Sequence, residues 1–132
     1  MLFPQYELKA DETLTIFEFV SVGNKGNITK VVHFLKLSEN FYNLGFGDKD
    51  EETGEISDLI VSNNGDSQKV LSTVAASVLE FTNYYPNALV YATGSTKART
   101  RLYRIGITNN LAEISRDFYV FGEQNQTFQE FI

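Results

Sequence analysis

The chain has 132 residues, of which 42% are hydrophobic and 14% aromatic, and this favours one folded domain over residues 1–132 with its own core. It contains no cysteine, which excludes disulfides, Cys-ligated zinc and thiol catalysis and is compatible with a reducing cytoplasm. The formal net charge of -6 disfavours the coating of nucleic acid, because an acidic surface repels phosphate. We expect neither a signal peptide nor a membrane span, because no long apolar run occurs, and we expect a cytoplasmic protein.

The first half of the chain has the alternating pattern of an antiparallel meander. A short edge strand is predicted at residues 6–8, followed by strands over 14–22, 28–37, 41–47 and 56–61. The glycines and asparagines of residues 23–27 predict a hairpin loop. In the strand over 14–22 both faces carry apolar side chains, so we expect both faces to be covered.

Two polar features of this half invite a functional interpretation. Residues 48–58 carry six acidic residues, but the glycine falls one place later than an EF-hand loop requires, so we interpret the segment as a solvated hairpin tip. His33 is the only histidine of the chain. We interpret it as a packed or solvated side chain, because no carboxylate is placed by the sequence to orient it.

The second half begins with a predicted helix over residues 67–84, which follows a loop rich in capping residues and ends before Pro86. Its apolar residues recur at helical spacing, which predicts one face packed on the sheet. Four residues are expected on the opposite side, namely Thr73, Ala76, Ser77 and Glu80.

A strand is predicted over 89–92, a helix over about 96–105, a short helix over 109–116, and strands over 117–121 and 127–132. The predicted fold class is therefore α+β: a mostly antiparallel sheet, built as an N-terminal meander, followed by helix, strand, helix and strand.

Basic residues gather directly after the strand over 89–92. A strand that turns through small residues into a helix presents free backbone amides and the positive end of the helix dipole, which favour a phosphate or carboxylate. The segment KARTRLYR, residues 97–104, has four basic residues and no acidic one. We predict a site for an anionic small molecule made by Gly94, Ser95, Thr96, Lys97, Arg99, Arg101 and Arg104.

Two other interpretations of the basic segment stay open. In the first, the segment contacts nucleic acid or an acidic protein partner, for example in a toxin and antitoxin pair, and Tyr103 stacks on a base beside Arg99. In the second, the basic helix face pairs with the acidic residues of 48–58 and has only a structural role.

The sequence ALVYATGSTKARTRLYRIGI, residues 88–107, resembles the last conserved part of the GNAT acyltransferase family, in which a strand precedes a helix of the form N-x-x-A-x-x-LY-x-x-x-GF. The matching residues are Ala98, Leu102, Tyr103, Gly106 and Ile107. The order of meander, long helix, strand, helix and strand is also similar to the GNAT fold.

The GNAT resemblance implies acetyl-CoA as a cofactor and Tyr103 as a general acid near the leaving thiolate, a role for which a phenol is suited. It implies a pyrophosphate loop at residues 63–68, where this chain has one glycine, Gly65, and the acidic Asp66.

A second resemblance covers nearly the whole chain. The motifs VSNNGD, VLSTVAASVLEF and YATGSTKARTRLYRIGI resemble a family of short, functionally uncharacterised proteins from Bacteroidetes bacteria. This resemblance implies a bacterial cytoplasmic protein and supplies no activity.

Overall fold

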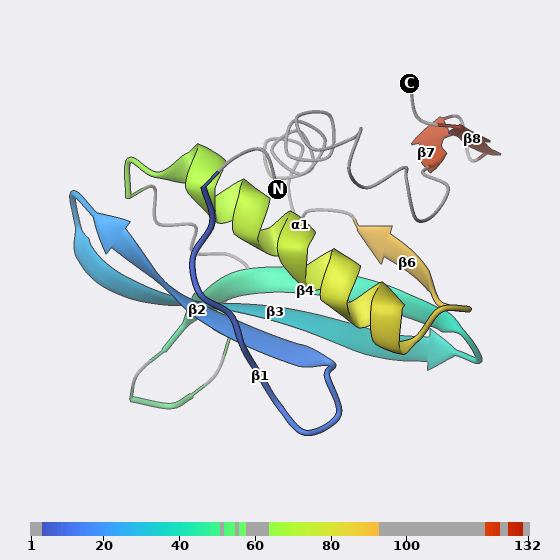
Figure 1. The fold of residues 1–132 in the computed structure, drawn as a ribbon, viewed down its shortest axis with the longest axis horizontal. Coiled ribbons are helices and arrows are strands. Elements are labelled where there is room, and N and C mark those ends of the chain that lie inside the picture. The colour runs from blue at the N-terminus through green and yellow to red at the C-terminus, as the bar shows by residue number, and fades with distance from the viewer. Residues whose placement is uncertain are drawn as a thin grey trace.

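The computed structural model describes residues 4–50, 52–54, 56–57, 64–92, 121–124 and 127–130. Six strands form one sheet in the order β1-β2-β3-β4-β5, with β6 also paired to β4, and one α-helix lies across a face of this sheet (Figure 1). These elements are β1 (Lys9–Ala10), β2 (Ile16–Gly23), β3 (Gly26–Ser38), β4 (Phe41–Lys49), β5 (Ile56–Ser57), α1 (Ser67–Tyr84) and β6 (Leu89–Ala92). In the described residues a second sheet is formed by β7 (Phe121–Gln124) and β8 (Thr127–Glu130), which pair antiparallel. The mixed α+β class and the mostly antiparallel sheet are thus confirmed.

The helix over 67–84 and the strand over 89–92 are confirmed to the residue. β6 runs parallel to β4, with Phe41 opposite Leu89 and Leu44 opposite Ala92. Parallel neighbours need a crossover connection, and α1 lies within the one that joins β4 to β6. β5 pairs with the last two residues of β4, Asp48 and Lys49.

The first edge strand differs from the prediction, because β1 is Lys9–Ala10 and residues 6–8 are not in a strand. The backbone amide of Tyr6 donates to Thr73 Oγ1 on α1 (2.8 Å), which draws this part of the chain away from the sheet. The prediction for residues 6–8 was therefore wrong, because the long-range contact with Thr73 competes with strand pairing to β2.

The next strand begins at Ile16 rather than at residue 14. One oxygen of the Asp11 carboxylate accepts hydrogen bonds from the amides of Thr15 (3.0 Å) and Ile16 (3.1 Å), and Leu14 has a φ of 58°. A side-chain acceptor of this kind stabilises a turn in competition with a strand. At the other end of β2 the ladder continues to the pair Gly23 and Gly26, so the hairpin loop is shorter than residues 23–27.

The core lies between the sheet and α1 and is dominated by aromatic side chains. Phe81 of α1 is fully buried; its ring stacks on Phe34 with 4.0 Å between centroids and meets Tyr42 edge to face at 4.9 Å. The buried cluster comprises Phe17, Phe19, Val32, Phe34, Tyr42, Leu44, Phe46, Val70, Val74 and Phe81.

The helix is buried over a wider arc than its pattern predicts. Thr73, Ala76 and Ser77, which were expected opposite the apolar face, are all buried, whereas Glu80 is exposed. The two hydroxyl groups tolerate burial because they donate to carbonyls of their own helix: Thr73 to Lys69 O (2.7 Å) and Ser77 to Val74 O (2.6 Å).

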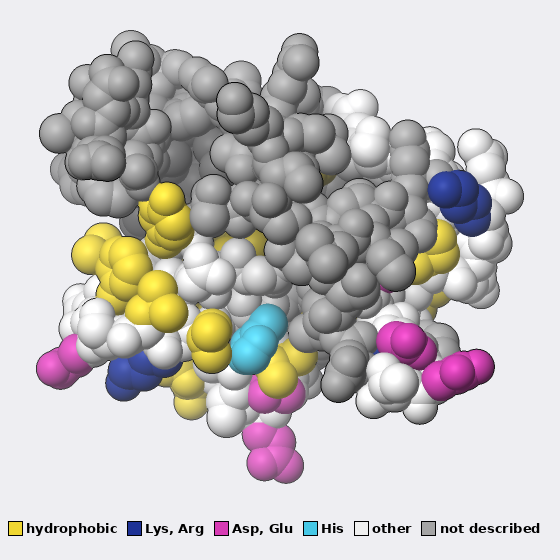
Figure 2. All heavy atoms as spheres, turned by 180° about the vertical axis from the view of Figure 1, so that it is seen from behind, with side chains coloured by type: hydrophobic (Ala, Val, Ile, Leu, Met, Phe, Trp, Pro, Cys, Tyr) yellow, Lys and Arg dark blue, Asp and Glu magenta, His cyan; other side chains and the backbone are white. Residues whose placement is uncertain are grey.

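The opposite face of the sheet is partly open, which contradicts the expected covering of both faces of β2. Val20 and Val22 are 44% and 57% exposed, and Leu35 and Leu37 of β3 are 50% and 55% exposed. Figure 2 views the molecule from this side and shows apolar side chains at the surface. The apolar residues on both faces of β2 did not reveal this exposure, because it depends on α1, which covers only one face of the sheet.

Candidate functional site

The predicted anion site lies outside the described residues. This applies to Gly94, Ser95, Thr96, Lys97, Arg99, Arg101 and Arg104, and also to Tyr103. The predicted helices over 96–105 and 109–116 also lie outside them, as does the strand predicted over 117–121 except for Phe121, which begins β7. The description stops at Ala92, the last residue of β6.

The loop before α1 is bound to the β2–β3 hairpin through Asn64, which is 2% exposed. Its Nδ2 donates to Gly26 O (2.8 Å) and Ser21 Oγ (3.1 Å), and its Oδ1 accepts from the amide of Lys25 (2.5 Å). The contact is also close at the backbone, since a Cβ atom added to Gly23 would lie 2.0 Å from Asn64 O. Asn64 therefore has a structural role in joining the hairpin to the helix.

The carboxylate of Asp66, at the start of α1, belongs to the same contact. Its Oδ2 accepts hydrogen bonds from Tyr6 Oη and from Ser21 Oγ, both at 2.5 Å, and it makes no capping bond to the helix. The positive end of the helix dipole thus has a negative side chain beside it, which disfavours a bound phosphate. The described part of residues 63–68 therefore does not support the pyrophosphate loop that the GNAT resemblance implies.

Tyr6 connects the N-terminal segment to both β2 and α1. Its hydroxyl accepts a hydrogen bond from the amide of Val22 (3.1 Å), its ring stacks on Phe19 at 5.8 Å, and Lys69 Nζ lies 4.2 Å from the ring centroid. Burial raises the pKa of the hydroxyl above 10.0, and the hydrogen bond to Asp66 raises it further.

The variant Tyr6→Phe is expected to lose about 1–3 kcal/mol of unfolding free energy near neutral pH, because it leaves Val22 N–H without its partner and removes one of the two hydrogen bonds to the Asp66 carboxylate. The folded pKa of Tyr6 is raised, so this stabilisation is fully present below the unfolded pKa near 10.0 and is lost as the pH rises through the folded value. Urea unfolding from pH 7 to 11 would show the difference between wild type and variant constant at first and then shrinking. Tyr84→Phe, at a position 58% exposed, is the control; a difference that grows at high pH contradicts the prediction.

A buried ion pair joins β3 to β4. Lys30 Nζ lies 2.5 Å from Asp48 Oδ1, with the side chains 2% and 12% exposed. The sequence interpretation placed Asp48 in a solvated tip, which was wrong for this residue but holds for residues 52–54, which are exposed. The sequence did contain a signal for the burial of Lys30. In the alternating pattern of β3, Lys30 shares a face with the core residues Val32 and Phe34.

Two further described charges of the acidic segment, Lys49 and Asp50, are also engaged locally. Lys49 Nζ lies 3.3 Å from Glu18 Oε1, and Asp50 Oδ1 accepts from the amide of Glu52 (2.8 Å). Asp48, already paired with Lys30, is therefore not a free partner for the basic helix. Within the described ranges, no group of three or more His, Cys, Asp or Glu residues is placed to hold a metal ion. His33 is half-buried in β3, opposite Ile16 and Gly45.

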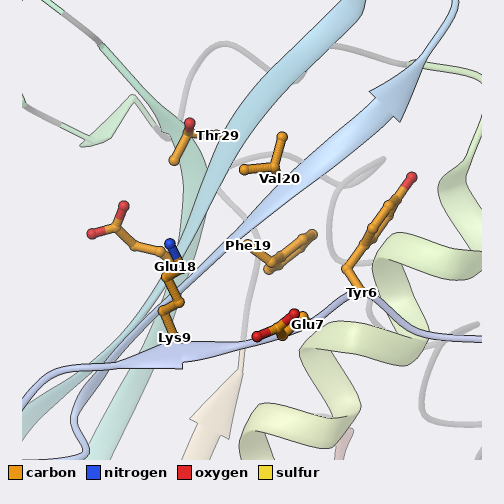
Figure 3. A pocket seen from close by; sticks show the side chains of 7 residues that line it. All are labelled: Tyr6, Glu7, Lys9, Glu18, Phe19, Val20 and Thr29. Atoms are coloured by element: carbon orange, nitrogen blue, oxygen red, sulfur yellow. The ribbon is translucent and has the colours of Figure 1, made fainter.

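A pocket of about 440 Å³ lies at the β2 edge of the sheet. Figure 3 shows the rings of Tyr6 and Phe19 on one side of it and the side chains of Glu18 and Thr29 on the other. The remaining lining residues are Glu7, Lys9 and Val20. With two carboxylates and one ammonium group in its lining, this pocket is not suited to an anion.

The fold and these contacts define a mixed α+β protein in which a β-meander and one crossing helix are joined by polar contacts at the start of the helix. The chain belongs to the family of unknown function DUF6934, whose profile matches residues 3–132. No curated protein and no solved structure matches it. Within the part of the chain that the structure describes, no helix is long and apolar enough to cross a bilayer.

Proposed function

We propose that this protein binds a phosphate-bearing or other anionic ligand through residues 94–104, the basic segment that follows β6. The observation that carries the proposal is the parallel pairing of β6 with β4. In open sheets, ligands bind beyond the carboxyl ends of parallel strands, and β6 ends at Ala92, two residues before Gly94. The four basic residues of 97–104 supply the charge.

The described contacts also weigh against one competing interpretation. If the basic helix had only a structural role, the acidic residues of 48–58 would be its natural partners. Asp48 is instead paired with Lys30 in the core, and Asp50 accepts backbone amides of its own turn. Two of the six acidic residues that this interpretation needs are therefore engaged elsewhere.

The GNAT resemblance belongs to this proposal as one possible scaffold. A meander, a crossing helix and a strand parallel to β4 of the meander are similar to that order of elements. The engaged Asn64 and Asp66 weigh against acetyl-CoA as the ligand. A fold resemblance does not establish activity, so Tyr103 as general acid stays a prediction, as do the bacterial source and the cytoplasmic location.

Isothermal titration with inorganic pyrophosphate, ATP and acetyl-CoA tests the proposal. We expect at least one of them to bind, and the double variant Arg101→Ala/Arg104→Ala to weaken that binding about tenfold or more, because two charge-assisted contacts are lost. Lys25→Ala removes a positive charge from the exposed β2–β3 loop and is expected to leave binding unchanged. Absence of binding at millimolar concentrations would contradict the proposal.

The alternative is an interaction module for nucleic acid or for an acidic protein. It predicts binding of single-stranded RNA or DNA that weakens with added salt, because neutralised phosphates release counterions. Salt-sensitive binding of a labelled oligonucleotide, lost in Arg101→Ala/Arg104→Ala and without any small-molecule binding, would replace our proposal with this one.

A further inference from the structure

The β1–β2 ladder is interrupted at Val20. β1 and β2 pair with Lys9 opposite Glu18 and Ala10 opposite Phe17. The same register, continued toward the N-terminus, would place Glu7 opposite Val20 and supply a pair of backbone hydrogen bonds there. Glu7 is not in a strand, because the segment turns toward α1, where the amide of Tyr6 donates to Thr73.

The backbone groups of Val20 point to this gap. Residues two apart on a strand direct their amide and carbonyl groups to the same side. Ile16 O accepts from the amide of Asp11 (3.0 Å) and Val22 N–H donates to Tyr6 Oη (3.1 Å), so both face away from β3. The amide and carbonyl of Val20 therefore face away from β3 as well, and no described residue bonds to them on that side.

Val22 adds an acceptor to the same edge. Tyr6 Oη lies 3.2 Å from Val22 O and 2.5 Å from the Asp66 carboxylate. A hydroxyl has one proton, and the shorter contact to a charged acceptor is the stronger one. The Tyr6 proton therefore goes to Asp66, and Val22 O can accept from a further donor.

The pocket described above occupies this gap, and Val20 is one of its lining residues (Figure 3). Its 440 Å³ lie in the range that holds a small ligand. It combines an unpaired strand edge with the aromatic surface of Tyr6 and Phe19 and with two carboxylates, Glu7 and Glu18, against one lysine, Lys9.

We propose that this gap is a binding site for a short extended peptide with a basic side chain. The peptide takes the place of Glu7 opposite Val20: one of its amides donates to Val20 O and one of its carbonyls accepts from Val20 N–H, as in strand addition. Its apolar side chains lie on the aromatic surface, and its basic side chain is favoured by Glu7, since Glu18 is paired with Lys49. The site shares no residue with the anionic-ligand site over residues 94–104 and does not depend on it.

The test uses the capped tripeptide acetyl-VKV-amide and NMR titration of the full chain. We expect millimolar binding with a shift of the Val20 amide resonance. Val20→Pro removes the N–H that faces the gap and spares the β2–β3 ladder, and proline is tolerated where an edge amide faces outward. It is expected to weaken binding about fivefold or more, the value of one hydrogen bond. The matched control Val20→Ala keeps the amide and is expected to bind within about twofold of wild type.

A measurement on the wild-type protein is independent of how the proline variant folds. The Val20 amide is expected to exchange with solvent rapidly without peptide and more slowly at saturation. Slow exchange without peptide would show that Glu7 already pairs with Val20 and would overturn the proposal. Equal binding by wild type and Val20→Pro would also overturn it, and equal binding of acetyl-VEV-amide would overturn the preference for a basic side chain.

Discussion

Replacing Asp48 with alanine is expected to lower the free energy of unfolding by about 3–5 kcal/mol. The reason is that Lys30, with its side chain 2% exposed, would keep a charge in the core without the carboxylate that lies 2.5 Å from it in the wild type. Removal of one partner of a buried pair is costly because the remaining charge loses that compensation while it stays shielded from water. Urea unfolding followed by far-UV circular dichroism measures the loss.

Two control variants separate the ion pair from simple loss of volume. In Lys30→Met/Asp48→Leu both charges are replaced by apolar groups of similar size, and we expect most of the lost stability to return. Glu18→Ala breaks the pair with Lys49. Because the side chain of Glu18 is 38% exposed and that of Lys49 is 32% exposed, this variant should lose less than about 1 kcal/mol of unfolding free energy. A loss in Asp48→Ala no larger than that in Glu18→Ala would contradict the prediction.

Phe81→Ala is expected to destabilise the fold by about 3–5 kcal/mol, because it opens a cavity at the centre of the aromatic core. Phe81 is 0% exposed and touches the rings of Phe34, at 4.0 Å, and of Tyr42, at 4.9 Å. It therefore joins α1 to both β3 and β4, and its loss weakens the packing of the crossover on the sheet. Thermal and urea unfolding measure the effect.

The matched control for Phe81 lies on the same helix. Tyr84→Ala also removes an aromatic ring, but from a side chain that is 58% exposed, and should cost less than about 1 kcal/mol. A loss in Phe81→Ala no larger than that in Tyr84→Ala would contradict the prediction, because alanine does not lower the helix propensity at either position.

The sequence by itself determined the elements whose signals are local and repeated. The helix over 67–84 follows from the 3.6-residue period between Val70 and Phe81 and from Pro86, and β6 follows from a short apolar run between turns. The meander followed from alternation. The helix and the meander agree with the structure because their backbone hydrogen bonds are formed within the element or with the next strand along the chain, whereas β6 pairs with the distant β4.

The residues of the anionic site, unlike these elements, are predicted from the sequence alone. The strand before it is confirmed, but residues 94–104 lie outside the described part, so the site is a proposal supported by charge and by the parallel strand. The pocket at Val20 could not be predicted from the sequence. Its existence depends on Tyr6 being drawn toward Thr73 and Asp66, which are 67 and 60 residues away in the sequence.

Only the tertiary structure decided which polar groups are buried and which apolar groups are not. Lys30 and Asp48 look like surface charges in the sequence, yet the pairing of β3 with β4 places them together in the core. Val20 and Val22 look like core residues, yet they remain exposed because α1 covers the other face. A side chain's own chemistry sets the cost of burial, but the segments that pack around it determine whether that cost is incurred.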